Sequence, residues 1–339
     1  MADVPPVMRF ESSTGVRIYR ISCEAFPGFI AHAYLLVGAG PVTLVDTGSG
    51  YGHSDDQLRA GLAAVRSDHG EPFDLTDIRR IIVTHGHIDH FGGLARLVKE
   101  TGARVAIHEL DRRILTNYAE RVTVATQAFE VFLARSGVGP ELQSQMVAMF
   151  QYSKRHVVNV PVDITLVDGL ELDGLRFLHT PGHCSGQVCI AVGNVLLSAD
   201  HVLQRITPHQ SPESITPYTG LGHYFEALEK LRRWGSFDLT LGGHEGLIED
   251  LPKRIEEIRQ SHLRRLDRVL ELLDLAEGPQ TIAQLAQSMF RRARGFDVLL
   301  AFEEVGAHVE YLYERGRLAV DNFEDLGRES NPPLRYRRA

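Results

Sequence analysis

The sequence predicts a mixed α/β region with covered sheets, followed by a part that is wholly helical. Short apolar runs rich in Val, Ile and Leu recur up to about Gly242, and most are bounded by Gly, Asp or Pro, which is typical of strands. Helical stretches separate several of these runs, for example at 55–67, 91–101 and 223–234. This alternation favours an architecture in which helices cover the faces of the sheets.

The chain of 339 residues is long for a single core and predicts two domains, residues 1–250 and residues 251–339. Within the first domain, the stretch 109–156 has no strand signal and predicts two or three helices inserted after the run "RVAIH". Its Phe and Met residues, among them Phe132 and Met149, recur at helical spacing. They predict either an ordinary buried helix face or a lid of adaptable side chains over a substrate.

Composition excludes several classes of protein. The hydrophobic fraction of 43% and the charged fraction of 24% are ordinary for a globular chain. A net charge of -8 argues against nonspecific nucleic-acid binding, because phosphate contacts need clustered cations. No segment approaches the ~20 apolar residues of a membrane span, and no signal-peptide pattern begins the chain. Three cysteines, Cys23, Cys184 and Cys189, are too few for a disulfide framework, so we expect a reducing cytoplasm.

The stretch "THGHIDHFGG", from Thr84 to Gly93, concentrates imidazole and carboxylate side chains after an apolar run. In a helix, His85 and His87 would point about 200° apart at ~100° per residue, so both could not reach one ion. In an extended chain, residues i and i+2 share a side. The preceding run "RRIIVT" predicts a strand, so His85 and His87 chelate together at its end, while Asp89 and His90 face a second point where a helix begins.

Three later strand-like runs also end in a coordinating residue. His183 ends the run "LRFLHTPGH", and Asp200 ends "NVLLSAD". His244 ends "LTLGGH", where it follows two glycines that permit close backbone approach. A layered sheet would bring these strand ends to one edge. Together with the first cluster they make five imidazoles and two carboxylates, a set suited to two divalent ions, zinc first, with iron or manganese as alternatives.

The residues that carry this pattern resemble the metallo-β-lactamase fold superfamily over roughly residues 15–250. The matching motifs are Asp46 in "LVDTGSG", the full "THGHIDHFGG", His183 in "TPGHCSG", Asp200 in "LSADH" and His244 in "LGGHEG". The resemblance implies an α+β fold, the four-layer αββα sandwich, with a dinuclear metal site at one edge.

The resemblance also implies two ligand sets joined by a bridging Asp200. The ligands divide as follows: His85, His87 and His183 for the first ion, and Asp89, His90 and His244 for the second. Asp89 and Asp200 are the expected catalytic residues, with Asp89 orienting the nucleophile and moving a proton. Asp46 would orient a ligand histidine; the alternative is a plain turn residue at the end of a strand.

Departures from the family pattern reduce the number of reactions that we expect the protein to catalyse. True β-lactamases of the superfamily generally lack a bridging aspartate at the position of Asp200, so antibiotic hydrolysis is disfavoured. The diiron flavoprotein branch has a glutamate where this chain has His87, which disfavours electron transfer. Cys184 stands where the family often has a hydroxyl or small residue. We expect it to be a packing residue; a thiol beside a metal site would alternatively be sensitive to oxidation.

The C-terminal part predicts a long helix from Pro252 to about Leu275 with Asp250 as its N-cap, then "GPQTIAQLAQ", a third helix and a turn-strand. This order is similar to the winged-helix appendage of β-lactamase-like hydrolases related to glyoxalase II. From Lys253 onward there are 15 Lys/Arg and 15 Asp/Glu, a poor surface for phosphates. We therefore favour a homodimer interface or a pocket wall over DNA binding.

The site predicts hydrolysis of a small-molecule substrate by a metal-bridging hydroxide. The first hypothesis is a thioester or ester hydrolase resembling hydroxyacylglutathione hydrolase or an acyl-CoA thioesterase, with the basic residues Lys154, Arg155 and His156 meeting an anionic carrier. Phosphodiesterase or ribonuclease activity is the alternative, with lactonase activity beside it. A non-enzymatic scaffold with a winged-helix binding module is the third hypothesis; a complete set of ligands for two ions argues against it.

Overall fold

The computed structural model describes residues 4–152 and 157–339, and the chain forms two compact units, each assembled from separate stretches. The first unit contains the chain up to Tyr118, Val157–Pro208 and Ala227–Ile255. The second contains the helices after Tyr118, His209–Glu226 and Glu256–Ala339. The predicted boundary between 250 and 251 stays a prediction. Each unit is therefore built from stretches that are separate in the sequence, and no unit corresponds to one continuous stretch.

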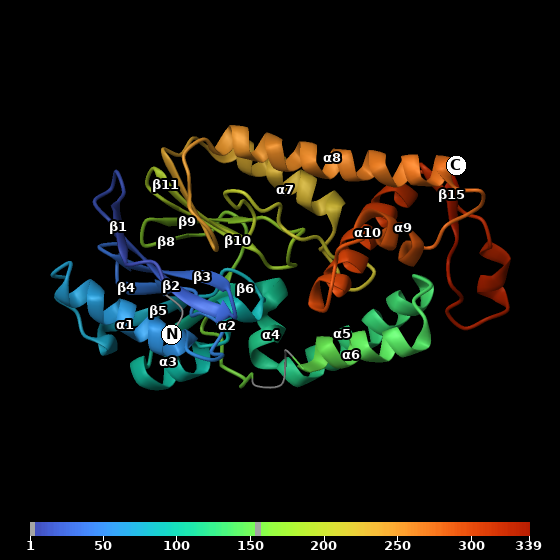
Figure 1. Ribbon diagram of the computed structural model, residues 1–339. Coiled ribbons are helices and arrows are strands. Elements are labelled where there is room, and N and C mark those ends of the chain that lie inside the picture. The colour runs from blue at the N-terminus through green and yellow to red at the C-terminus, as the bar shows by residue number, and fades with distance from the viewer. Residues whose placement is uncertain (1–3, 153–156) are drawn as a thin grey trace. The chain divides into compact units, whose positions relative to one another are not determined.

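Two sheets make up the first unit (Figure 1). The larger has seven strands in sequence order, antiparallel from β1 to β4 and parallel from β4 to β7. Its strands are β1 (Met8–Glu11), β2 (Arg17–Phe26), β3 (Phe29–Val37), β4 (Val42–Val45), β5 (Ile78–Ile82), β6 (Arg104–His108) and β7 (Ile164–Leu166).

The smaller sheet has six strands in the order β13-β12-β11-β10-β9-β8, and only the β11–β12 pair is parallel. These strands are β8 (Glu171–Leu172), β9 (Leu175–His179), β10 (Val188–Val192), β11 (Val195–Ala199), β12 (Leu239–Gly242) and β13 (Leu247–Ile248). The central strands β10 and β11 consist mainly of aliphatic residues and are buried on both faces, as expected for a sheet covered by helices.

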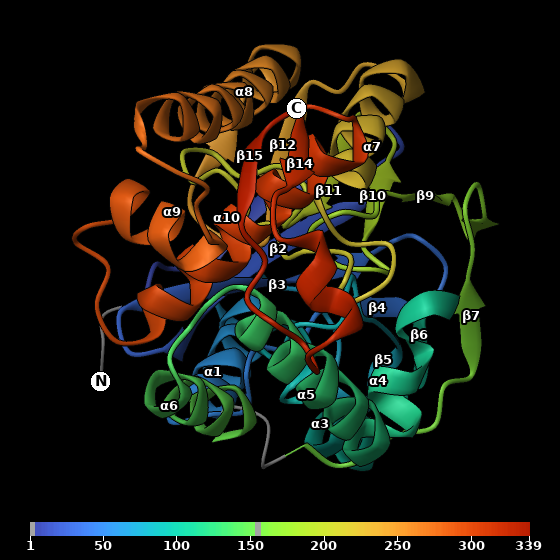
Figure 2. The ribbon, with the colours of Figure 1, turned by 90° about the vertical axis from the view of Figure 1, so that its right-hand side faces the viewer.

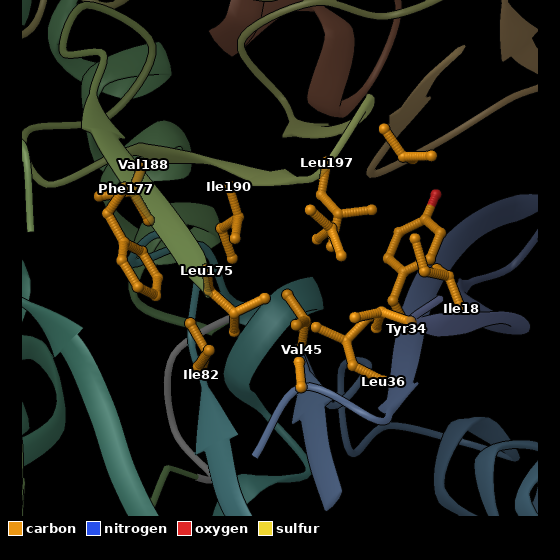
Figure 3. Close-up of a cluster of buried hydrophobic side chains, with 14 of the residues drawn as sticks. Ile18, Tyr34, Leu36, Val45, Ile82, Leu175, Phe177, Val188, Ile190 and Leu197 are labelled. Atoms are coloured by element: carbon orange, nitrogen blue, oxygen red, sulfur yellow. The ribbon is translucent and has the colours of Figure 1, made fainter. Parts of the chain in front are cut away.

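The hydrophobic core of the first unit lies between its two sheets (Figure 3). Ile18, Leu36 and Ile82 of the seven-stranded sheet pack against Phe177 and Ile190 of the six-stranded sheet, and all five are fully buried. Such burial stabilises the fold by roughly 1.5–3 kcal/mol per large aliphatic side chain. The sequence pattern that predicted strands is therefore the pattern that fills this core.

Helices cover the outer faces of both sheets. On the seven-stranded sheet lie α1 (Ser54–Ser67) and α3 (Leu94–Thr101), which follows the short α2 (Ile88–Phe91); a Cβ at Gly61 of α1 would sit 2.2 Å from Ile21 of β2, so the helix lies directly on the strand. On the six-stranded sheet lies the second half of α7 (Leu221–Trp234), where Lys230 donates to the carbonyl of His179 and Arg176 stacks on Trp234. The expected αββα sandwich is confirmed.

The second unit is mainly helical. The insertion supplies α5 (Tyr118–Arg135) and α6 (Pro140–Tyr152), which lie side by side (Figure 2), after α4 (Arg112–Thr116) in the first unit. The C-terminal part supplies α8 (Leu251–Leu275), α9 (Ile282–Met289), α10 (Phe296–Glu314) and the antiparallel pair β14 (Leu318–Val320) and β15 (Tyr336–Arg338). Asp250 accepts the Lys253 N–H at 2.9 Å, as predicted for the α8 N-cap. None of the described helices has the length and apolar character needed to cross a bilayer.

Candidate metal centre

The first motif leaves β5 in an extended conformation, as the sequence predicted. His87 has φ -90° and ψ 141°, and His85 Nε2 lies 3.1 Å from His87 Nδ1. His183 reaches the same point from the turn between β9 and β10, with its ring centroid 4.5 Å from that of His87 and 5.4 Å from that of His85. One ligand atom from each of these three side chains lies within 4.8 Å of the other two. We call them the first set.

A second set of three forms beside the first. Asp89 and His90 lie in α2, and His244 follows the end of β12 after one further glycine, Gly243. Asp89 Oδ2 lies 3.7 Å from His90 Nε2 and 3.4 Å from His244 Nε2. A Cβ at Gly243 would sit 2.2 Å from Asp200 Oδ1 and 2.7 Å from the His90 ring, so only glycine lets the backbone pass this close.

Asp200 stands between the two sets. Its Oδ2 lies 3.6 Å from His183 Nε2 and 4.0 Å from His85 Nε2 in the first set, and 3.1 Å from His244 Nε2 in the second. Its Oδ1 faces His90 Nε2 at 3.4 Å. Both sets and Asp200 come from strand ends that meet at one edge of the sandwich, because β4 and β5 run parallel in one sheet and β11 and β12 run parallel in the other. All seven side chains named from the sequence therefore gather in one place.

Neighbouring polar groups orient the imidazoles of the second set. Asp46 follows β4 with φ 61°, a left-handed turn, and its Oδ2 accepts the His90 Nδ1–H at 2.8 Å. The same carboxylate accepts the backbone N–H and the hydroxyl of Thr84, both at 2.8 Å. His244 Nδ1 donates to the carbonyl of Ile30 at 2.6 Å. Asp46 is thus both a turn residue and a partner of His90, and in both histidines Nε2 is left to face the centre.

The two sets differ in electrostatics. Burial and the neighbouring imidazoles hold the pKa of His85 well below its usual range and lower the pKa of His87 to about 3, so these rings are neutral. Burial also opposes a charge on His244, but Asp200 outweighs it and raises the pKa of His244 to about 10. Asp200 keeps a pKa well below the ordinary value because His244 and His90 outweigh the cost of its burial. A concentration of negative charge therefore lies between neutral and protonated imidazoles.

The donor set fits a pair of divalent ions. Two donors bound tetrahedrally at ~2.0–2.1 Å lie about 3.3 Å apart. The neighbouring donor atoms here lie 3.1 to 4.0 Å apart, so small side-chain shifts suffice. His90 Nε2 and Asp200 Oδ1 are buried and have no hydrogen-bond partner among the described residues, a cost that a bound cation removes. Asp89 is partly open, with 12% of its side chain exposed, and His87 is also partly buried rather than fully enclosed.

Sequence reasoning missed Asp111, which lies in the predicted insertion but belongs to the first unit. Its buried carboxylate accepts the Cys184 thiol at 3.2 Å. Burial and Asp111 raise the pKa of Cys184 well above its ordinary value, so the sulfur is a protonated donor, and the described sulfur atoms join none of the metal-ligating groups. Cys184 is buried, as expected for a packing residue, and the alternative of a thiol that is sensitive to oxidation stays a prediction. The sequence signal for Asp111 was the presence of an acidic residue three positions after the strand-like run "RVAIH".

A further group of ligand-type side chains, His262, Glu304 and His308, lies in the second unit. His262 Nδ1 faces His308 Nε2 at 3.2 Å, but the Arg265 guanidinium already donates to Glu304 Oε1 at 2.8 Å and lies 3.5 Å from His262 Nδ1. A divalent ion among these atoms would lie against a fixed positive charge. This group is a charge-compensated core network.

The structure tests the predicted lid only in part, because it describes Phe132 and Met149 but not residues 153–156. Phe132 of α5 is only 6% exposed and packs on Gly306 of α10, where a Cβ would sit 2.6 Å from its ring. It therefore serves the core of the second unit, which the sequence offered as the plainer interpretation. Met149 is partly buried. The basic residues Lys154, Arg155 and His156 lie outside the described residues, and cover of the metal edge by the insertion stays a prediction.

Comparison with known proteins agrees with this geometry. The family model of the metallo-beta-lactamase superfamily matches residues 26–297. The crystal structure of a metallo-beta-lactamase family protein from Thermus thermophilus gives a TM-score of 0.75 at 29% identity, covering 95% of this chain and 98% of that one. A probable metallo-hydrolase of Bacillus subtilis is 23% identical over 82% of this chain and 86% of its own length. An atrochrysone carboxyl ACP thioesterase of Aspergillus fumigatus is 24% identical over 77% of this chain and 68% of its own.

The match to the family model covers most of the chain, and the Thermus structure shares its fold nearly end to end. With the histidine and aspartate sets assembled at the edge of the sandwich, the chain belongs to the metallo-beta-lactamase superfamily and is a metal-dependent hydrolase.

Proposed function

We propose that the protein hydrolyses a thioester or ester of a small molecule with two divalent ions, zinc in first place. The observation that carries the proposal is the position of Asp200, whose carboxylate lies within 4.0 Å of imidazoles from both sets. Five imidazoles suit zinc better than magnesium or calcium, which prefer all-oxygen sites. Similarity to an acyl carrier protein thioesterase supports the thioester class.

Each side chain has a distinct task in this proposal. The first set would hold one ion through neutral imidazoles, and the second set would hold the other through two imidazoles and Asp89. Divalent ions held there would supply a bound water with a pKa near neutrality and a Lewis acid for the substrate carbonyl. Asp89 is partly open to solvent, so it is placed to accept a hydrogen bond from that water and to take its proton.

An exposed aromatic ring adjoins the centre and supports an acyl substrate. Phe29, in the β2–β3 hairpin, is 38% exposed and has its ring 4.4 Å from that of His244. An exposed aromatic ring beside metal ligands can hold an acyl chain while the polar carbonyl faces the ions. No serine or cysteine nucleophile is required, and the buried Cys184 thiol is held as a hydrogen-bond donor.

The test combines metal analysis with a substrate panel. We expect close to two zinc ions per chain after incubation with zinc, and turnover of acyl thioesters above that of simple esters, lactones and a phosphodiester. Asp200→Ala should lose more turnover than His244→Ala, because the Asp200 carboxylate lies within 4.0 Å of imidazoles of both sets, whereas His244 belongs to the second set alone. Absence of bound metal would reject the centre, and preferential turnover of the phosphodiester or the lactone would replace the thioester assignment.

A further inference from the structure

Asp111 joins the two loops that carry the first set. It ends the turn that follows β6, and its side chain is 1% exposed. Its Oδ2 accepts the backbone N–H of Gly86, the residue between His85 and His87, at 2.8 Å. Its Oδ1 accepts the backbone N–H of Gly186, three residues after His183, at 3.0 Å. One carboxylate therefore fixes the distance between the segment of His85 and His87 and the segment of His183.

Gly86 and Gly186 lie so close to the Asp111 carboxylate that neither position has room for a side chain. A Cβ at Gly186 would sit 2.6 Å from Asp111 Cγ and 2.8 Å from Asp111 Cβ. A Cβ at Gly86 would sit 3.3 Å from Asp111 Cγ and 2.1 Å from Ile114. Neither glycine has a positive φ, so backbone conformation does not demand them. Both loops are built to approach one buried carboxylate with their N–H groups.

The second set is oriented in a different way. Asp46 accepts the ring N–H of His90, and the Ile30 carbonyl accepts the ring N–H of His244. Asp111, in contrast, binds the backbone beside the ligands of the first set. Loss of a group that orients metal ligands typically costs 10–100-fold in metal affinity. The effect of losing Asp111 should therefore fall on one of the two ions.

We propose that Asp111 is the positioning residue of the first set, and that its carboxylate sets the loop spacing on which zinc affinity at His85, His87 and His183 depends. This inference rests on the proposed metal centre. Asp111→Asn keeps the size of the side chain but replaces one acceptor oxygen with an NH₂ group, which then faces an N–H or S–H donor. The loops would separate at that contact, and the donors of the first set would move apart.

The experiment measures zinc binding in proteins that keep one intact set. His244→Ala leaves the first set complete, and His87→Ala leaves the second. By competition with a chromophoric chelator, Asp111→Asn should lower zinc affinity ~10–100-fold in the His244→Ala protein and leave it unchanged in the His87→Ala protein. Denaturant unfolding of the metal-free proteins is the control, because a merely structural role would lower stability equally in both backgrounds without separating their affinities.

Gly186→Ala provides a second route if Asp111→Asn does not fold, because its Cβ must displace the same carboxylate. Gly186→Ala should also lower zinc affinity in the His244→Ala protein and leave zinc affinity unchanged in the His87→Ala protein. Equal affinities with and without either substitution, or equal losses in both sets, would overturn the role of Asp111 while leaving the metal centre standing. Failure of both single-set proteins and of the unsubstituted protein to bind zinc would instead reject the centre itself, and Asp111's role with it.

Discussion

At the scale of residues, the centre depends on which imidazole nitrogen faces the ions. A neutral imidazole has one donor and one acceptor nitrogen, so a hydrogen bond from one nitrogen selects the other as ligand. Asp46 makes this selection for His90 and also fixes Thr84 through two further hydrogen bonds. A single buried carboxylate thereby connects the end of β4 to the metal-binding loop.

Asp46→Ala should weaken metal binding by ~10–100-fold, because the His90 ring loses the acceptor that orients it. The loss should appear in the second set, as measured by zinc competition in the His87→Ala protein. Asp46→Asn, which keeps an acceptor oxygen, should recover part of the affinity. Unchanged affinity in Asp46→Ala would mean that the residue serves the turn alone.

At the scale of elements, polar contacts on helices fix segments that have no regular structure of their own. The stretch before α7 is attached to α10 in this way. His209 Nε2 lies 3.0 Å from Glu303 Oε2, and the backbone N–H of Gln210 donates to Glu304 Oε2 at 2.9 Å. Burial opposes a charge on His209, but hydrogen bonds to Glu303 and Glu304 outweigh it and raise its pKa to about 9.

This raised pKa gives a stability prediction. A histidine whose pKa rises on folding stabilises the folded protein fully below its unfolded pKa, near 6.5, and loses that contribution as the pH rises through about 9. The His209 side chain is 26% exposed, so we expect about 1–2 kcal/mol after allowing for solvent screening. The unfolding midpoint of His209→Gln should lie below that of the unsubstituted protein at about pH 6 and approach it at about pH 9.5. A difference independent of pH would contradict an ionic contact.

At the scale of the whole molecule, all seven proposed ligands belong to the first unit, although they come from stretches as far apart as His85 and His244. Ligand binding stabilises the folded state by RT ln(1 + [L]/Kd), which is ≈ 4.1 kcal/mol at a thousandfold excess over Kd. This stabilisation of the folded state acts on the segments that carry the metal ligands. The second unit holds no proposed ligand of this centre.

Zinc should therefore slow amide hydrogen exchange selectively. Comparison of the metal-free and zinc-loaded protein should show added protection around 83–91, 181–187, 199–202 and 242–246, because these segments close around the ions. The helices α8, α9 and α10 should change little and act as the internal control. Protection concentrated in α8 and α10 would place the metal at His262, Glu304 and His308 instead.

The sequence predicted strands β2 to β7 and β9 to β12, together with the candidate ligands and their order, because each depends on local chemistry. Period-2 and apolar runs predict strands, and an imidazole or carboxylate at a strand end is visible from residue types alone, as with His183 and Asp200. The family resemblance then supplied their division into two sets. These inferences need no knowledge of which distant residues meet.

Tertiary structure decided the rest, because it depends on contacts between segments far apart in the chain. Asp111 is an ordinary acidic residue until the fold brings Gly86 and Gly186 to its two oxygens. The spacing of Phe132 favoured a buried helix face and left a lid as the alternative, and its packing on Gly306 assigned it to the core of the second unit. Helical periodicity identifies a buried face but not the element that covers it, and only the assembled chain supplies that partner.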